Sequence, residues 1–308
     1  MDTAGSHVHK QELTIEDLER KLDALPMLPS VVTRLLSLRA DDDDFFEKVV
    51  DVAREDPPLA TRLLRLANSA SSAPASPITA LPQAVTRIGA RSVAGLVTSM
   101  AVLRVFVPTT DGQRRFWIHS IQAGVAAQTI ARSVPKLGIA PEQAYLCGLM
   151  HDIGRFVLFE GAPEELGRVD ETNWATPAEL IAAEKEICGF DHAELGWHAC
   201  RKWGLPSLVS EVVQTHHVYA GRHGERPDAH MEKLVEVVQM ADFLSLVFIG
   251  HPEIEEWSQE AKEALIAKEC IHPAWSSPPM TARSLAGHAQ RIFLESHRMI
   301  DGLGLTPG

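Results

Sequence analysis

Cysteine and tyrosine are scarce in this sequence, and long apolar runs are missing. The four cysteines are too few and too scattered for a disulfide framework, and no two form the C-x-x-C pair of thioredoxin-like centres or thiolate zinc sites. A membrane span needs about 18 consecutive apolar residues, and no such run occurs. The polar segment Met1 to Gln11 also lacks the apolar core of a secretory signal. These absences predict a protein of the reducing cytoplasm.

Positive charge is also in deficit. The 308 residues include 29 Lys and Arg against 41 Asp and Glu, a formal net charge of −12. Broad, sequence-independent nucleic-acid binding depends on a Lys/Arg surface, so this balance argues against it and leaves room only for a local basic pocket. A hydrophobic share of 45% is typical of a globular protein with a substantial core. Histidine, with 14 residues, is the unusual count.

Helical apolar periodicity recurs along the chain, whereas alternating strand patterns are almost absent. Proline stands near expected helix starts, as at Pro141 and Pro177, and glycine at expected stops, as at Gly189 and Gly204. The sequence therefore predicts an all-α fold. From the middle of the chain onward, helices are expected at about 115–134, 141–160, 177–188, 192–203, 206–217, 231–249 and 281–301.

The first third of the chain is expected to be a smaller helical lobe. Asp56 followed by Pro57 is typical of an N-cap and a proline at the first helical position. A helix pair is expected from residue 82 to about 107, broken near Gly89. The polar gap at 108–115 is the predicted lobe boundary. The leucine stripes of this lobe are interpreted as core, because no catalytic constellation accompanies them.

Candidate chemistry is concentrated in histidine and aspartate. The segment LCGLMHDIGRFVL places His151 and Asp152 inside an expected apolar helix, where polar side chains need partners. One His-Asp pair has little weight, since composition alone gives about 0.7 such pairs by chance. The ordered set is more informative, because each member falls on an expected helix. It consists of His119, His151, Asp152, His192, His216, His217 and Asp242.

Imidazole nitrogen and carboxylate oxygen are ligands for divalent first-row metals such as Fe, Mn, Ni or Zn. Seven such ligands exceed the needs of one tetrahedral ion, and an aspartate can bridge two ions. The sequence therefore predicts a divalent-metal site with up to two ions. The alternative is a polar cluster that is hydrogen-bonded internally and binds nothing.

The stretch from about Leu25 to His217 resembles the HDOD domain, the HD-related output domain of bacterial signalling proteins. The helix ending in Thr215-His216-His217 belongs to this resemblance. The other motifs, in order, are ALPMLPSVVTRLLSL (24–38), EDPPLATRLLRLANSA (55–70), PITALPQAVTRIGARSV (77–93), CGLMHDIGRFVL (147–158) and DHAELGWHACRKWGLP (191–206). The resemblance implies a cytoplasmic, two-lobed helical protein with an HD-superfamily lobe behind a smaller N-terminal lobe.

On this basis four segments are expected. Residues 1–20 are a tail and part of the first helix, and residues 21–110 are the N-terminal helical lobe. Residues 111–250 are the HD-like lobe with the metal site, and residues 251–308 are a C-terminal helical extension.

The resemblance also implies roles for the histidines and aspartates. Catalytic HD phosphohydrolases use a His, a His-Asp doublet and a distant Asp, which His119, His151–Asp152 and Asp242 match in order. The related HD-GYP phosphodiesterases add a further His and a His-His pair, which are similar to His192 and His216–His217. No Gly-Tyr-Pro follows here, so hydrolysis of cyclic di-GMP in the HD-GYP manner is not expected.

The predicted catalytic residues are Asp152 and Arg155, the latter standing where catalytic relatives often have Lys. Two ions bridged by Asp152 would lower the pKa of a shared water for in-line attack on phosphorus. Arg155 would stabilise the phosphoryl oxygens, since arginine can bind a phosphate bidentately. The polar loop 218–230 is either a solvated connection or a lid over a phosphate-bearing ligand, through Tyr219, Arg222, His223 and Arg226.

HDOD members are generally regulatory modules. The leading hypothesis is a bacterial signal-transduction protein that acts by binding signalling proteins or a nucleotide and retains an HD-type metal site. The alternative is a metal-dependent phosphohydrolase or phosphodiesterase acting on a nucleotide or cyclic dinucleotide. A third hypothesis is a cyclic-nucleotide sensor whose metal site binds without turnover. No membrane partner is expected.

Overall fold

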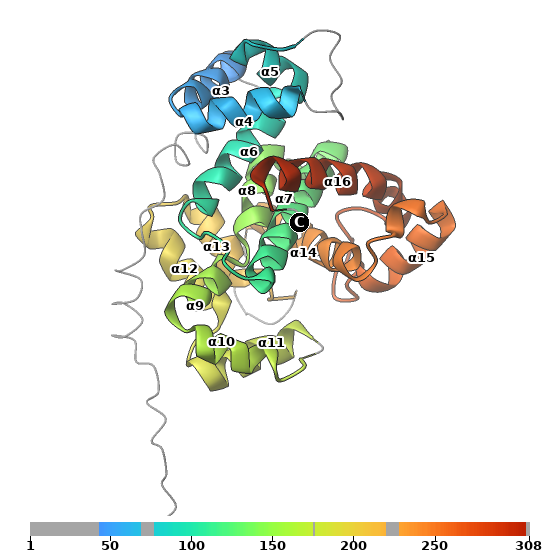
Figure 1. Cartoon of the computed structure of the whole chain (residues 1–308). Coiled ribbons are helices and arrows are strands. Elements are labelled where there is room, and N and C mark those ends of the chain that lie inside the picture. The colour runs from blue at the N-terminus through green and yellow to red at the C-terminus, as the bar shows by residue number, and fades with distance from the viewer. Residues whose placement is uncertain (1–42, 69–76, 175, 220–227, 306–308) are drawn as a thin grey trace, which may run out of the picture.

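Helices make up all of the regular structure in the computed structural model, which describes residues 43–68, 77–174, 176–219 and 228–305 (Figure 1). These ranges contain no β-strand, so the predicted all-α class is confirmed. None of the helices in the described part of the chain is both long and apolar enough to cross a lipid bilayer. The helices expected before residue 43 lie outside the described residues.

The helices follow one another along the chain with short connections. The first part comprises α3 (Phe45–Arg54), α4 (Pro57–Ala67), α5 (Leu81–Ile88) and α6 (Ala90–Leu103). The middle part comprises α7 (Asp111–Ser133), η1 (Pro135–Leu137), α8 (Pro141–Met150), α9 (Ile153–Gly161), α10 (Pro163–Asp170) and α11 (Pro177–Cys188). The last part comprises α12 (His192–Lys202), α13 (Ser207–Thr215), α14 (Ala229–Gly250), η2 (Ile254–Glu256), α15 (Gln259–Glu269) and α16 (Ala282–Leu303).

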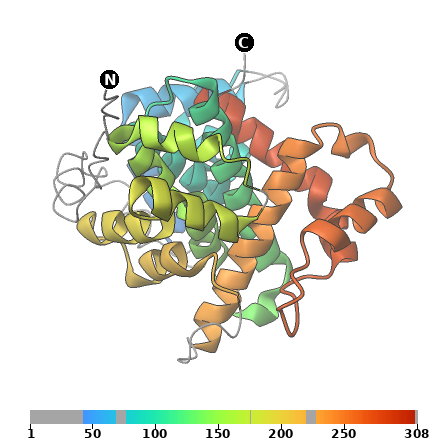
Figure 2. The ribbon, with the colours of Figure 1, turned by 90° about the horizontal axis from the view of Figure 1, so that it is seen from below.

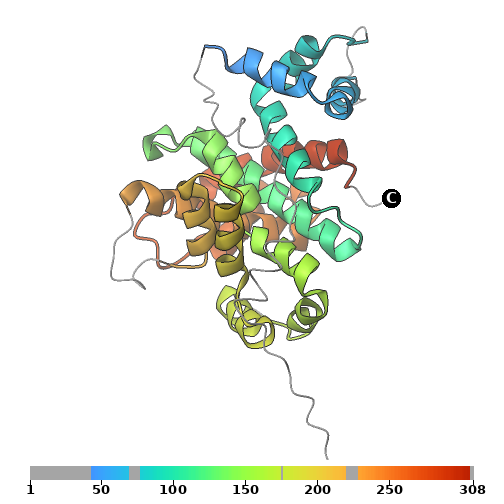
Figure 3. The same ribbon diagram turned by 90° about the vertical axis from the view of Figure 1, so that its left-hand side faces the viewer.

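Helices α3 to α5 lie together at one end of the molecule, and α6 runs from them into the main body (Figures 1 and 3). The side chain of Asp56 accepts a hydrogen bond from the backbone N–H of Leu59, and Pro57 takes the first helical position, as the sequence predicts. Gly89 separates α5 from α6 with a φ of 93°, a left-handed conformation that favours glycine. The expected break in this helix pair is confirmed.

Helix α7 is the centre of the main body. A capping box formed by Thr110 and Gln113 fixes its start, and every residue from His119 to Ala131 is buried. A helix buried on all sides must be surrounded by other elements, and α8, α14 and α16 pack against it. His119 therefore enters the interior from a rigid, fully packed element.

Small residues allow α7 and α8 to approach closely. A Cβ on Gly148 would lie 2.7 Å from the carbonyl oxygen of Ala123, and a Cβ on Gly124 would lie 3.1 Å from that of Tyr145. The first distance leaves no room for a side chain at this crossing, and the second is tighter than an ordinary van der Waals contact. The close contact places the C-terminal end of α8, which carries His151, directly against the central helix.

The remaining helices cover the core from several sides. Helices α12 and α13 lie on one side of the molecule, and α15 lies on the opposite side beside α16 (Figures 1 and 2). Helices α10 and α11 lie at the end opposite α3 to α5 (Figures 1 and 3). Five helices, α7, α8, α12, α13 and α14, thus meet around the middle of the body, where they carry or flank the predicted metal ligands.

Several helix predictions are confirmed, one is wrong, and two helices were not predicted. Helices are present near 115–134, 177–188, 192–203, 206–217, 231–249 and 281–301. The single helix expected at 141–160 is wrong, because the chain breaks between α8 and α9 at His151–Asp152. Helices α10 and α15 were not predicted, since α10 has only eight residues and α15 buries few apolar side chains. The predicted segment boundaries at residues 110 and 250 stay predictions. The boundary at 110 falls between the end of α6 and the start of α7.

Candidate metal centre

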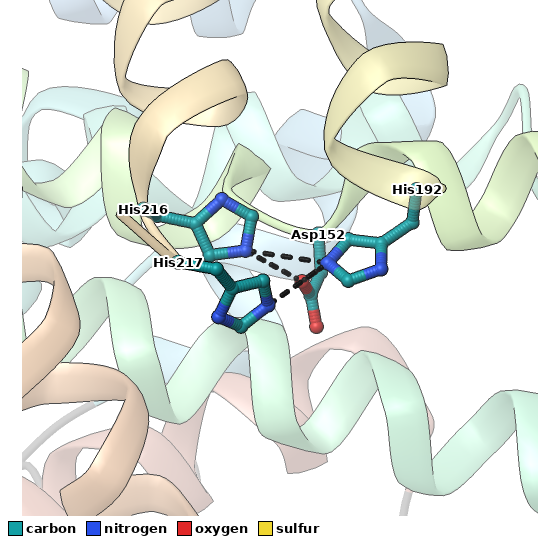
Figure 4. Close-up of side chains that lie close together, drawn as sticks. All are labelled: Asp152, His192, His216 and His217. Carbon is teal, nitrogen blue, oxygen red and sulfur yellow. Dashed lines mark hydrogen bonds and ion pairs between the residues drawn. The ribbon is translucent and has the colours of Figure 1, made fainter. Parts of the chain in front are cut away.

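Two groups of potential metal ligands face each other inside the main body. Asp152, His192, His216 and His217 each offer one ligand atom, and these atoms all lie within 4.8 Å of one another (Figure 4). A second group with the same property consists of His119, His151 and Asp242. The structure thus brings together all seven residues singled out in the sequence. His217 is half-buried, and the other six are buried.

Most of these side chains come from helix junctions. His151 follows α8, Asp152 precedes α9, and His192 is the first residue of α12. His216 and His217 follow α13. The expectation that every member lies within a helix is therefore wrong for four of the seven residues. A junction lets two adjacent residues point into one space, which the 100° step of a continuous helix would prevent.

Asp152 lies between the two groups. Its Oδ1 atom is 3.1 Å from Nε2 of His192 and 3.1 Å from Nε2 of His216. Its Oδ2 atom is 3.5 Å from Nε2 of His119 and 3.5 Å from Nε2 of His151. Each carboxylate oxygen therefore faces a different set of imidazoles, which is the arrangement that a bridging ligand requires.

Two of the histidines have their tautomers fixed by backbone carbonyls. Nδ1 of His151 is 2.8 Å from the carbonyl oxygen of Gly148, and Nδ1 of His216 is 2.7 Å from that of Val213. A carbonyl oxygen can only accept, so in each ring Nδ1 carries the proton and donates. The Nε2 atom of each neutral ring is then a free lone pair aimed into the centre.

Side chains fix two further rings in the same way. Nδ1 of His192 donates to Oε2 of Glu184 over 2.6 Å, and the backbone N–H of His192 donates to the same oxygen over 2.9 Å. Nδ1 of His119 is 2.6 Å from Oγ of Ser245, whose hydroxyl donates to the carbonyl oxygen of Asp242 and is left to accept from the imidazole. Metal-binding histidines typically donate their other ring N–H to such a partner.

The Nε2 atoms consequently crowd together. Nε2 of His119 is 3.2 Å from that of His151, and Nε2 of His192 is 3.4 Å from that of His216 and 3.0 Å from that of His217. Lone pairs facing one another at these distances repel unless a positive charge lies between them. A proton or a divalent cation would supply that charge, so the donor set fits a metal ion.

The protonation pattern of the metal-free centre is consistent with this need for positive charge. Burial opposes a charge on His192, but Glu184 and Asp152 attract it more strongly and raise the pKa of His192 to about 10. Burial lowers the pKa of His151 to about 4. Burial also disfavours the charge on Asp152, yet His151 and His192 hold the pKa of that carboxyl well below its usual value. A proton on His192 therefore balances the bridging carboxylate at neutral pH.

The side chain of Arg155 is buried, and its guanidinium is already paired with Asp170. Its Nη2 atom donates to Oδ1 of Asp170 over 2.8 Å, and its guanidinium lies 5.5 Å from the ring centroid of Phe116. Its Nε atom lies 3.9 Å from Oε1 of Glu184, too far for a hydrogen bond. The predicted phosphate contact of Arg155 stays a prediction, and any such contact competes with Asp170.

Three residues that support the centre were not predicted from the sequence. Glu184 and Ser245 orient His192 and His119, and Gln239 donates to the carbonyl oxygen of His216 over 2.8 Å. Glu184 lies among other glutamates of α11, whereas Gln239 and Ser245 are isolated polar residues between apolar neighbours in α14, a pattern that indicates a need for partners without identifying them.

The predicted lid falls mostly outside the described residues, which omit 220–227. Tyr219, at its start, is described. Its ring stacks on the imidazole of His272 with a centroid distance of 3.8 Å. The choice between a lid and a solvated connection stays open.

Comparisons with solved structures agree with this architecture. An HDOD domain protein from Geobacter sulfurreducens is similar with a TM-score of 0.68 and 21% identity, over 93% of this chain and 96% of that chain. A second similar structure is a provisionally assigned phosphohydrolase from Shewanella amazonensis SB2B. Its TM-score is 0.68 and its identity is 24%, over 93% of this chain and 98% of that chain. At these identities the likeness establishes the fold.

Sequence comparison identifies the family. A curated protein of uncharacterised function from Treponema pallidum (strain Nichols) is 26% identical over 197 residues, which is 64% of this chain and 38% of that protein. This chain therefore spans well under half the length of that relative. The HDOD domain model matches residues 25–219, which is most of the chain. The chain belongs to the HDOD domain family.

Proposed function

We propose that this HDOD protein is a signal-transduction protein that carries a divalent-metal centre and acts by binding another protein or a nucleotide. The observation that carries the metal assignment is the fixed set of tautomers. Four imidazoles donate through Nδ1, and their Nε2 atoms converge around one carboxylate, Asp152. An internally satisfied polar cluster would pair donors with acceptors, whereas this one needs an added positive charge, either a proton on His192 or a metal ion, to separate its converging acceptors.

The ligand chemistry favours Fe, Mn, Ni or Zn, because the donors are imidazole nitrogens and carboxylate oxygens without thiolates. The two groups support two ions, with His119, His151 and Asp242 on one side and His192, His216 and His217 on the other. Asp152 would be shared between them.

Elemental analysis of freshly purified protein tests this proposal. We expect about two equivalents of metal per chain, as in bridged two-metal sites. Asp152→Ala should lose both ions because both groups lose their shared ligand. His198→Ala is a matched control, since His198 is exposed on α12, the same helix that begins with His192. Negligible metal in the wild-type protein, with His151→Ala leaving stability unchanged, would refute the metal centre.

A second candidate is a metal-dependent phosphohydrolase or phosphodiesterase. The specific observation in its favour is that the two oxygens of Asp152 face different ligand groups, as in two-metal hydrolytic sites. Bound ions would supply Lewis acidity toward water and a phosphoryl oxygen. The chain itself would hold the ligands rigid through Glu184 and Ser245, and Arg155 would contact phosphate only if its pair with Asp170 opens.

A turnover screen separates the two candidates. Metal-loaded protein is incubated with nucleotides and cyclic dinucleotides, and products are measured by chromatography, with Asp152→Ala as the inactive reference. Product formation that Asp152→Ala abolishes supports the enzyme. Saturable binding without product, by isothermal titration, supports a nucleotide sensor. Binding of a signalling protein that survives Asp152→Ala supports a scaffold whose metal is not part of its output.

A further inference from the structure

Three neighbouring hollows lie between α16 and the helices α4, α5 and α6, and the third also reaches the start of α7. Their volumes are about 650, 290 and 400 Å³. The first and second share Leu66 and Arg298, and the second and third share Arg62 and Gly304. The hollows are therefore parts of one elongated depression, the α16 groove. None of the seven predicted metal ligands lines it.

The α16 groove is rich in arginine. Its cationic lining residues are all arginines, without a lysine: Arg62, Arg65, Arg87, Arg104, Arg114, Arg291 and Arg298. Among the described residues, only two carboxylates line it, those of Glu295 and Asp301. Two further carboxylates, Asp56 and Asp111, pair with Arg104 and Arg114 from outside the lining, so within the described part of the chain the lining arginines outnumber these carboxylates. In a chain of net charge −12 this is a local concentration of positive charge.

The floor of the α16 groove is apolar. The largest hollow is lined by Leu66, Ile88, Leu96, Leu294 and Met299, and the third by Met100, Leu103, Val107, Pro108, Leu303 and Leu305. Four large hydrophobic residues are exposed in the described part of the chain, and two of them lie here. Val107 is 61% exposed and Leu294 is 42% exposed. Exposed apolar side chains rimmed by charge are typical of a binding surface.

The spacing on α16 produces an ordered pattern. Arg291, Leu294 and Arg298 are three and four residues apart, so they share one helical face with the apolar residue between the two cations. From Gln290 to Leu303 the helix rises about 20 Å, the length of nearly four helical turns. The groove thus has the length and the alternation of an elongated peptide site.

We propose that the α16 groove binds an acidic amphipathic helix of a partner protein. The planar guanidinium groups match carboxylates in bidentate geometry, and the apolar floor matches the apolar face of such a helix. An anionic polymer such as polyphosphate would satisfy the arginines and leave the apolar floor exposed to water. Charge complementarity and the exposed apolar residues together therefore favour the amphipathic segment.

Peptide selection on the full-length chain tests the proposal directly. A displayed random library of peptides of about 14 residues, ~21 Å as a helix, is selected on the wild-type protein. Peptides that also bind the Arg291→Glu/Arg298→Glu variant are removed from the library. We expect recovered sequences enriched in Asp and Glu, with apolar residues at helical spacing. Binding of the best peptide is then measured by fluorescence anisotropy.

The Arg291→Glu/Arg298→Glu substitutions should lower the affinity for that peptide by at least about 10-fold, because two positive charges are replaced by negative ones. Leu294→Asn, which removes the apolar side chain without adding charge, should weaken it by a similar factor, which a charge-only interaction with the arginines would not produce. Arg283→Glu/Lys136→Glu makes the same change in net charge at exposed residues outside the groove and should leave binding unchanged. Arg291→Ala/Arg298→Ala, checked by circular dichroism, repeats the test without introducing acidic residues.

Four results would overturn the proposal. The first is a selection without enrichment of acidic residues, and the second is a Leu294→Asn variant that binds the peptide as tightly as the wild-type protein. The third is that inorganic polyphosphate, or vesicles of phosphatidylglycerol, bind through the same arginines more tightly than the best peptide does. The fourth is a dimer of the chain, detected by sedimentation, that the Arg291→Glu/Arg298→Glu substitutions dissociate. That result would assign the groove to a second copy of the chain.

Discussion

Gly154 lies directly against the backbone of His192. A Cβ built on Gly154 would overlap the carbonyl oxygen of His192 and approach the backbone nitrogen of Gly196 to 2.7 Å. Helices α9 and α12 therefore cross with their backbones in contact. This crossing brings His192, at the start of α12, within 3.1 Å of Asp152, at the start of α9. The glycine of the His-Asp-Ile-Gly segment thus sets the distance between two predicted ligands.

Gly154→Ala should destabilise the protein by about 3 kcal/mol, because the neighbouring atoms belong to backbone and cannot move aside like a flexible side chain. Urea denaturation followed by circular dichroism measures this change. Gly167→Ala in α10 is the matched control, since no atom lies within 4 Å of its added Cβ. That control should be neutral or more stable by up to about 1 kcal/mol, as expected for alanine in place of a helical glycine. Equal effects of both substitutions would contradict the backbone contact.

Glu184→Gln should lower the pH-independent metal affinity, obtained after correction for proton competition at His192, by about 10- to 100-fold while the fold is retained. The glutamine oxygen can still accept from His192, but the negative charge that makes this imidazole a stronger ligand is lost. Glu186→Gln, an exposed residue on the same helix, is the control and should change nothing. Competition with a chromophoric chelator gives the affinities. Unchanged metal affinity in Glu184→Gln would separate Glu184 from the metal centre.

The sequence was sufficient for the helical class and for the identity of the converging residues. The helix start at Asp56–Pro57 and the helix break at Gly89 depend only on residues adjacent in sequence. They could therefore be predicted without knowledge of the tertiary structure. The break at His151–Asp152 was missed because apolar residues continue on both sides of it. Periodicity therefore indicated one helix where tertiary packing selects two.

The supporting residues could not be found in the same way. Glu184 precedes His192 by eight residues and reaches it only because the chain turns at Gly189, between α11 and α12. The α16 groove joins Arg62 and Arg87 to Arg291 and Arg298, which are about 200 or more residues apart in the chain. Such relationships depend on tertiary packing and carry no local pattern.

Asp56→Ala should destabilise the protein by about 1 to 2 kcal/mol. The substitution removes the N-cap of α4, worth about 1 kcal/mol, and the partly exposed ion pair with Arg104, worth at most about 1 kcal/mol. The hydrogen bond from Arg104 lowers the pKa of Asp56 below its ordinary 3.8. Its contribution is therefore full above that value and is lost as the pH falls through the lower pKa of the folded state.

Thermal or urea denaturation at pH 7 and again in acid tests this. Asp51→Ala is the control, because its pair with Arg54 is an exposed pair within one helix and should contribute less than about 0.5 kcal/mol. A loss in Asp56→Ala no larger than in Asp51→Ala at pH 7 would show that the cap contributes little.

Metal affinity should rise with pH across the neutral range. His192 carries a proton in the metal-free centre, because its pKa is raised to about 10, and it must lose that proton to bind a cation. Each pH unit below 10 should therefore cost up to about 10-fold in apparent affinity. Chelator competition at several pH values gives the slope, and isothermal titration in two buffers of different ionisation enthalpy counts the protons released. Glu184→Gln lowers the pKa of His192 and should flatten the slope, whereas Glu186→Gln should not. Affinity that is independent of pH, with no proton release, would mean that His192 is not a ligand.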